Sequence, residues 1–229
     1  MGAEFSRKRS ISRCISKVCL NLPYYMSAKR TDPISLSQFL EKFRAHFPIS
    51  PEKWDDYIGR FKRVQVPAKT ILLQEGDISR KAYLIEKGCL RVWFINKGEE
   101  VTFQFFFENN TVSSIESFKK SIPSLFSIET IEPCTLWWID KTDVESMLEE
   151  VNEIAAIRNQ VMDVMFERTL NYIQHFLSFI RDTPQERYEN LITNQPYIVQ
   201  RVPQHYIASY LGISRVHLSR IKNKIARGK

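Results

Sequence analysis

The last 29 residues combine cationic side chains with the residue spacing of two helices joined by a tight turn. Residues 201–229 contain seven Lys and Arg and no Asp or Glu. Ala208 suits a close helix crossing, Gly212 suits a left-handed turn, and Ser214 suits the N-cap of a second helix. The apolar positions that would pack between the helices are Ile207, Leu211, Ile213, Leu218 and Ile221. The pattern predicts a helix-turn-helix from Gln204 to Asn223.

A helix-turn-helix places its second helix in the major groove of DNA, where the first turns of that helix contact base edges. The base readers predicted on this ground are Ser214, Arg215, Val216, Ser219 and Arg220. Arg215 and Arg220 can each donate two hydrogen bonds to guanine, whereas Val216 can contact a thymine methyl group. Contacts to phosphate are expected from residues at the start of the motif and late on the second helix, namely Gln204, His205, Lys222, Lys224 and Arg227.

Net charge is distributed unevenly along the chain. The total is +7, but residues 1–30 carry +6 and residues 201–229 carry +7, so residues 31–200 carry −6. A basic end on an acidic body indicates a module that binds a polyanion, and double-stranded DNA is the expected partner. No run of about 18 apolar residues could span a membrane. Four cysteines without a CxxC pair are typical of reduced thiols, so a cytoplasmic protein is expected.

The elements that must position this motif can be predicted from hydrophobic periodicity. Helical spacing in residues 36–47, then Ser50 and Pro51 as a helix start, predict two short helices. Residues 61–140 consist of short β-rich runs separated by glycine turns. No helices alternate with these runs, so an antiparallel sheet structure is expected rather than a parallel α/β fold.

Helical periodicity returns after residue 140. Residues 144–148 predict a short helix, and residues 154–180 predict one much longer than usual, with an apolar seam that would pack on a second copy of the chain. A core helix covering the sheet is the alternative reading. A short strand is expected in YIVQRVP, residues 197–203. The domains expected are a basic flexible arm at 1–30, a sensor domain at 31–140, a linker and dimerisation helix at 141–181, and a DNA-binding domain at 182–229.

The segment VPQHYIASYLGISRVHLSRIKNKI resembles the DNA-binding end of the cyclic-AMP receptor protein/FNR (Crp/Fnr) family of bacterial transcription regulators. The order of parts agrees over roughly residues 35–225, including glycines at Gly76 and Gly88. The resemblance implies an α+β chain with an N-terminal antiparallel β-roll of the cyclic-nucleotide-binding type, a long dimerisation helix and a C-terminal helix-turn-helix domain. It further implies a homodimer and RNA polymerase as a possible partner.

The same resemblance locates an effector pocket in FFENNTVSSIESF and SIPSLF, with Ser113, Ser114, Glu116 and Ser124 as its candidate residues. Members that bind cyclic nucleotides use a Gly-Glu pair and an Arg-Ser pair there. In this chain Ser113 and Ser114 replace the first pair, and no cation lies between Lys120 and Lys141 to neutralise a phosphate. Control by cyclic AMP is therefore not expected. A small apolar effector among the aromatics of the roll, or no ligand at all, are the alternatives.

No cofactor, metal or catalytic site is expected. An iron–sulfur cluster of the FNR type needs four thiolates, three of them closely spaced, and the N-terminal region offers only Cys14 and Cys19. None of the four histidines falls in the roll as a haem ligand. Motifs of nucleotide-binding, zinc-protease and serine-hydrolase enzymes are absent from the sequence. A sequence-specific transcription regulator is the favoured function, and a signalling or scaffold protein with a degenerate roll is the alternative.

Overall fold

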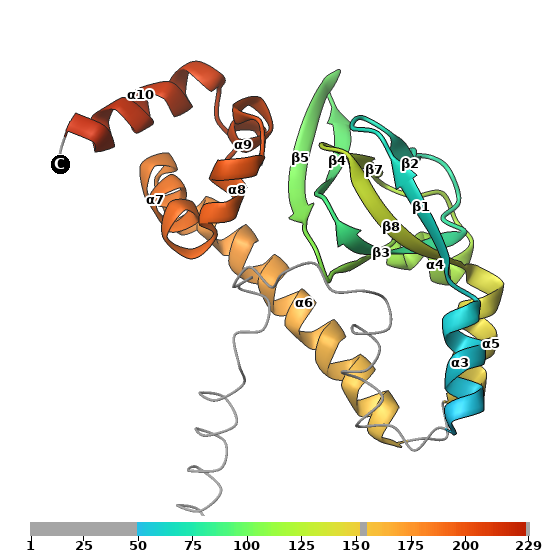
Figure 1. Cartoon of the computed structure of the whole chain (residues 1–229). Coiled ribbons are helices and arrows are strands. Elements are labelled where there is room, and N and C mark those ends of the chain that lie inside the picture. The colour runs from blue at the N-terminus through green and yellow to red at the C-terminus, as the bar shows by residue number, and fades with distance from the viewer. Residues whose placement is uncertain (1–49, 152–154, 228–229) are drawn as a thin grey trace, which may run out of the picture. The chain divides into compact units, whose positions relative to one another are not determined.

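The β-rich region forms two four-stranded antiparallel sheets, which confirms the expected antiparallel architecture (Figure 1). The computed structural model describes residues 50–151 and 155–227. The helix expected at 36–47 and the arm expected at 1–30 lie outside these residues. All described residues belong to one compact unit that spans residues 31–229. The strands are β1 (Lys62–Val66), β2 (Ile71–Leu73), β3 (Lys81–Lys87), β4 (Leu90–Asn96), β5 (Glu99–Phe106), β6 (Thr111–Val112), β7 (Ser127–Thr130) and β8 (Cys134–Asp140).

The two sheets have the strand orders β1-β8-β3-β6 and β2-β7-β4-β5. Alternate side chains of these strands point inward and form one apolar core, in which Ile85, Leu90 and Leu136 have no exposed surface. The chain passes from the first sheet to the second at Gly88, whose φ is +112°. A Cβ atom at this position would lie 2.4 Å from the Sγ of Cys134, so only glycine fits there.

The remaining described elements are helices, and two of them begin at capping signals that the sequence contains. They are α3 (Pro51–Gly59), α4 (Ile115–Lys120), α5 (Lys141–Val151), α6 (Ala155–Arg181), α7 (Pro184–Asn194), α8 (Pro196–Arg201), α9 (Gln204–Tyr210) and α10 (Arg215–Arg227). Ser50 caps α3, and Pro51 occupies its first position, as expected. Thr183 and Glu186 form a capping box at the start of α7. None of the described helices is long and apolar enough to cross a bilayer.

The strand expected in residues 197–203 is wrong, because residues 196–201 form the helix α8. The β-branched residues suggested a strand, but Pro196 starts a helical turn, and the N–H of Val202 donates to the carbonyl oxygen of Ile198 (2.9 Å). The turn places Ile198 and Val202 together in the core, and both are buried. A helix satisfies its backbone hydrogen bonds internally, whereas a lone strand would need a partner strand.

The long helix α6 has two faces with different surroundings. One face lies against the body of the chain, where Arg168 contacts Thr111 and where His175 and Phe179 lie close to α9 and the turn that follows it. The other face repeats every three or four residues and is exposed to solvent, at Met162, Phe166, Ile173, Phe176, Leu177 and Ile180. We call these six residues the α6 seam.

Candidate nucleic-acid interface

The helices α9 and α10 meet at a turn of the helix-turn-helix type. The N–H of Gly212 donates to the carbonyl oxygen of Ser209, and the N–H of Ile213 donates to that of Ala208, both at 3.0 Å. Gly212 has a φ of +67°, the left-handed conformation that its position in the motif predicts. The N–H of His217 donates to Ser214 Oγ (3.2 Å), so the hydroxyl caps α10 as expected.

A small apolar core holds the two helices at their crossing. The side chains of Ile207, Leu218 and Ala208 are each 1% exposed, and Leu211 and Ile221 are also buried. Ile213 packs against the same cluster while it remains partly exposed. These are the residues that the sequence predicted to lie between the helices, so the motif is confirmed as a structural unit.

The turn also contacts the preceding helices. Arg187 of α7 donates to the carbonyl oxygen of Leu211 (3.0 Å), directly before Gly212. A Cβ atom on Gly212 would lie 2.8 Å from Cε1 of Phe179 on α6. The Phe179 ring is held by an edge contact with His175 (5.0 Å between ring centroids) and by the guanidinium of Arg187 (4.7 Å from the ring centroid). The angle between α9 and α10 therefore depends on packing against both α6 and α7.

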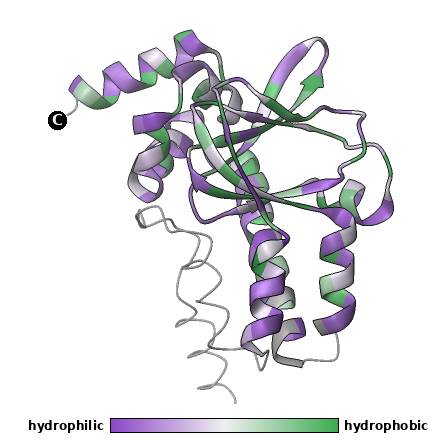
Figure 2. Ribbon diagram, turned by 45° about the vertical axis from the view of Figure 1, so that its right-hand side comes forward, coloured by the Kyte–Doolittle hydropathy of each residue, from purple (hydrophilic) through white to green (hydrophobic). Residues whose placement is uncertain are grey.

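The five expected base readers lie together on the exposed side of α10 and its N-cap. Ser214, Arg215, Val216, Ser219 and Arg220 are all exposed, and Val216 retains 61% of its surface. Figure 2 shows α10, which runs toward the C-terminus, with hydrophilic and hydrophobic residues alternating along the helix. Its apolar residues Leu218 and Ile221 face the core, so the cations point away from it. This surface can donate hydrogen bonds to an extended anionic partner.

The expected phosphate contacts surround this surface. Gln204, Lys224 and Arg227 are exposed, whereas His205 and Lys222 are half-buried. Lys224 donates to the side-chain oxygen of Gln185 on α7 (2.9 Å) and so lies beside α7. Burial lowers the pKa of His205, and the nearby guanidinium groups of Arg215 and Arg91 lower it further, so this imidazole is neutral at pH 7.

Arg201 does not belong with the other cations of the C-terminal segment. The absence of acids in residues 201–229 suggested that no carboxylate would pair with any of them. In the structure Arg201 forms a two-point ion pair with Glu108, at 2.8 and 2.7 Å, and also pairs with Glu132. Both carboxylates come from the roll, so Arg201 is engaged by ion pairs within the chain.

The structure brings together two of the four candidate effector residues. Ser114 and Ser124 are buried, and Ser124 Oγ lies within hydrogen-bond distance of both Ser114 Oγ (2.9 Å) and the carbonyl oxygen of Phe126 (2.7 Å). Ser113 is half-buried beside them, whereas Glu116 is exposed and pairs with Lys120 one turn away. The two buried hydroxyls therefore satisfy each other and the adjacent backbone.

Sequence reasoning missed two residues near this loop. Ser117 donates to the carbonyl oxygen of Ile122 (2.6 Å) and accepts from the N–H of Ser79 (2.9 Å), so this buried hydroxyl is also satisfied by backbone groups. Arg168 reaches from α6 to Thr111 just before the loop, where its Nη2 donates to the carbonyl oxygen (2.6 Å) and to Oγ1 (3.0 Å). Its position far along the sequence gave no signal of this contact.

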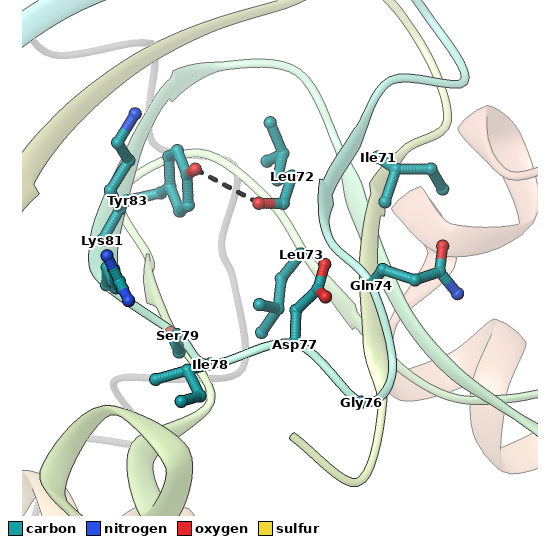
Figure 3. A pocket seen from close by; sticks show the side chains of 11 residues that line it. Ile71, Leu72, Leu73, Gln74, Gly76, Asp77, Ile78, Ser79, Lys81 and Tyr83 are labelled. Atoms are coloured by element: carbon teal, nitrogen blue, oxygen red, sulfur yellow. Dashed lines mark hydrogen bonds between the residues drawn. The ribbon is translucent and has the colours of Figure 1, made fainter. Parts of the chain in front are cut away.

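A recess of about 590 Å³ lies along the segment that joins β2 to β3 (Figure 3). Its wall mixes Leu73 and Ile78 with Asp77 and Lys81, and the hydroxyl of Tyr83 donates across it to the carbonyl oxygen of Leu72 (3.4 Å). No described residue of α6 lines this recess. Tyr83 is the one aromatic residue among the described residues of its lining, so the recess differs from the effector site expected among the aromatics of the roll.

Comparisons with known proteins agree with the architecture. Residues 63–151 match the family of the cyclic nucleotide-binding domain. A Crp/Fnr-family protein from Eubacterium rectale has a TM-score of 0.62 and 17% identity, covering 80% of this chain and 88% of that one. CLP, a c-di-GMP-responsive global regulator of Xanthomonas campestris, has a TM-score of 0.59 and 16% identity, covering 84% and 92%.

A variant of CooA from Carboxydothermus hydrogenoformans has a TM-score of 0.59 and 16% identity, covering 82% of this chain and 84% of that one. No curated protein sequence is significantly similar to the chain. Residues 63–151 therefore match the cyclic nucleotide-binding domain family, and the chain has the fold seen in solved Crp/Fnr regulators, in agreement with the resemblance drawn from its sequence.

Proposed function

We propose that the chain is a homodimeric, sequence-specific DNA-binding transcription regulator that acts in the cytoplasm and is not an enzyme. The observation that carries the proposal is the surface of α10, which exposes two arginines at base-reading positions on a helix packed in helix-turn-helix geometry. In this proposal residues 31–140 form the sensor domain, residues 141–181 form the linker and the dimerisation helix, and residues 182–229 form the DNA-binding domain.

The homodimer is supported by the α6 seam. Phe176 and Ile180 expose 63% and 70% of their surface, and Phe166 exposes 60%. A stripe of large apolar side chains along a helix is costly to leave in water, at about 25 cal/mol per Å². A second copy would cover it with an identical stripe, as in a two-stranded coiled coil, and would place two recognition helices on one DNA duplex.

The hydrogen bonds of the loop at residues 113–124 support a function that is independent of cyclic AMP. A bound phosphate needs backbone N–H groups, free donors and a cation. Here the hydroxyls of Ser114 and Ser124 are already hydrogen-bonded, and Arg168 donates to Thr111 from outside the loop. We therefore propose that the roll has the fold of a cyclic nucleotide-binding domain but lacks the residues that bind the phosphate group.

The test is selection of DNA from a random-sequence pool, followed by affinity measurements on the selected site with two variants. Arg215→Ala should lower the preference for particular base pairs by about 5- to 150-fold, because a two-point contact to guanine is worth roughly 1–3 kcal/mol. Lys224→Ala should weaken binding to all sequences and reduce the slope of log K against log salt by about 0.9 for each phosphate group that is no longer neutralised.

The matched control is Lys119→Ala, because Lys119 is an exposed cation of the roll on α4. This variant should leave both the sequence preference and the salt slope unchanged. Added cyclic AMP should not change the affinity of the wild-type chain. Equal affinity of the wild type for every sequence would refute the proposed function, and the signalling or scaffold role would then remain.

A further inference from the structure

The side of α9 that faces away from α10 is docked on the free edge of a β-sheet. β5 is the outermost strand of the sheet β2-β7-β4-β5, so part of its backbone has no partner strand. The N–H of Thr102 donates to Ser209 Oγ (2.9 Å), and this hydroxyl donates in turn to the carbonyl oxygen of Glu100 (3.1 Å). One serine thus satisfies a donor and an acceptor of an edge strand, groups that would otherwise need water or another chain.

Arg201, at the end of α8, provides a second attachment to the same part of the roll. Its guanidinium pairs with both oxygens of Glu108 and with Glu132, and it lies 5.0 Å from the ring centroid of Phe107. Glu108 Oε1 also accepts from the N–H of Gly88 (2.8 Å), which fixes the carboxylate to the turn between β3 and β4. The exposed fractions of the Arg201 and Glu108 side chains are 32% and 14%, so water screens this pair only in part.

Aromatic side chains fill the space between the two attachments. Phe105 of β5 contacts Tyr210 of α9 (5.2 Å between ring centroids), and Phe107 meets Tyr197 of α8 edge-on (4.7 Å). Arg91 lies 4.0 Å from the ring centroid of Tyr206 on α9. Contacts of this kind contribute beyond simple burial and have defined geometry, so they favour one orientation of α8 and α9 on the roll.

The docked position leaves the DNA-binding surface uncovered. The residues that contact the roll are Ser209, Tyr206 and Tyr210, whereas the base readers on α10 remain exposed. Tyr210 of α9 also contacts α6, because its ring stacks on that of His175 (4.5 Å between ring centroids, 13° between planes). The contacts of α9 therefore orient α10 relative to the roll and to α6, and they leave the exposed surface of α10 uncovered.

We propose that Ser209 and Arg201 are positioning residues that dock α8 and α9 on the β5 edge and thereby set the distance between half-sites that the dimer accepts on DNA. The inference rests on the proposed function. Two linked binding units gain roughly 10²- to 10⁴-fold in affinity only when the geometry lets both engage at once. A fixed orientation of each recognition helix limits that gain to one spacing, whereas a loosened helix would accept several.

The experiment compares the full-length wild type with Ser209→Ala and Arg201→Gln on three DNA probes. One probe carries two half-sites at the selected spacing, the second has that spacing lengthened by half a helical turn, about 5 bp, and the third carries a single half-site. We expect the wild type to prefer the first probe over the second by about 10²-fold or more. In both variants the preference for the first probe over the second should largely disappear, whereas the affinity for the single half-site should stay at the wild-type value.

The matched control is Arg63→Gln. Arg63 forms an equivalent two-point pair with Glu86, at 2.9 and 2.7 Å, but both residues belong to the roll. This variant should retain the wild-type spacing ratio. Glu132→Gln, which weakens the same attachment from the roll side, should behave like Arg201→Gln and provides a second variant should Arg201→Gln fold poorly.

The rate of hydrogen exchange at the Thr102 amide reports, in the absence of DNA, how often α9 separates from β5. Arg201→Gln does not touch Thr102, yet it should speed exchange there if the dock opens as a unit, whereas Arg63→Gln should not. Unchanged Thr102 exchange in Arg201→Gln, or a spacing ratio retained by both variants, would overturn the positioning role. A wild type that selects no DNA sequence would instead refute the proposed function, and the exchange result would still report on the dock.

Discussion

Replacing Gly212 by alanine tests how the turn between α9 and α10 is built. Gly212 has a φ of +67°, and a side chain in this left-handed region costs about 1–2 kcal/mol. The new Cβ would also lie 2.8 Å from Cε1 of Phe179. The ring is held between His175 and Arg187, so relief requires it to move and costs roughly a further 1–3 kcal/mol. We expect Gly212→Ala to lower the free energy of unfolding by about 2–5 kcal/mol in total.

A double-mutant cycle separates the two contributions. Phe179→Ala removes the ring and with it the crowding, but it leaves the backbone strain at residue 212 in place. In that background Gly212→Ala should cost only about 1–2 kcal/mol, which gives a coupling of roughly 1–3 kcal/mol between the two sites. The coupling is expected because the two residues are in contact across α6 and the turn.

Urea unfolding followed by circular dichroism at a helical wavelength is the suitable assay. Tryptophan fluorescence would report on the wrong region, because all four tryptophans lie between residues 54 and 138, far in sequence from the turn. A cost of less than about 0.5 kcal/mol for Gly212→Ala would refute the strain argument. If Gly212→Ala lowers the free energy of unfolding equally with and without the Phe179 ring, the crowding argument is refuted, and backbone strain alone explains the loss.

Three further predictions follow from burial and exposure. Phe176→Glu, in the α6 seam, should dissociate the proposed homodimer in analytical ultracentrifugation, whereas Gln174→Glu, which adds a charge on the polar face of the same helix, should not. The pKa of His175 is lowered from 6.5 by burial and by Arg187, so its contribution to stability is complete above pH 6.5 and is lost as the pH falls below it. The free energy of unfolding should then fall less steeply below pH 6.5 in His175→Phe than in the wild type, and identical slopes would contradict the assignment. Burial raises the pKa of Cys89 well above its ordinary value and that of Cys134 to about 11, so neither thiol should react with a maleimide at pH 7 until urea unfolds the chain, as mass spectrometry of the labelled peptides would show.

Features that depend on neighbouring residues could be predicted from the sequence. Alternation and glycine turns indicated an antiparallel β-structure, because inward and outward positions repeat every two residues along a strand. The helix-turn-helix could be located because its turn needs glycine at position 212 and its core needs apolar residues at fixed distances from it. The same local reasoning failed at residues 197–203, where β-branched residues were compatible with both a strand and a short helix.

Within the candidate sites, the residues could be predicted from the sequence, but not all of their hydrogen-bond partners could. The exposed base readers on α10 follow from helical geometry once the motif is placed. Ser114 and Ser124 could be named because a family resemblance aligned the loop, yet their mutual hydrogen bond depends on how the loop closes after α4. Arg168 gave no signal at all, since it reaches Thr111 from a helix 57 residues further along the chain.

The fold class and the position of the helix-turn-helix could be derived from the sequence alone, because both depend on residues that are neighbours along the chain. The pairing of Arg201 with the roll became visible only in the tertiary structure, since its partner Glu108 lies 93 residues away. The tertiary structure also decided that Ser209 closes a sheet edge, because Thr102 lies 107 residues away and the free edge exists only once the strand order is known. Periodicity records which face of an element is buried, whereas the neighbour that buries it is set by the packing of the whole chain.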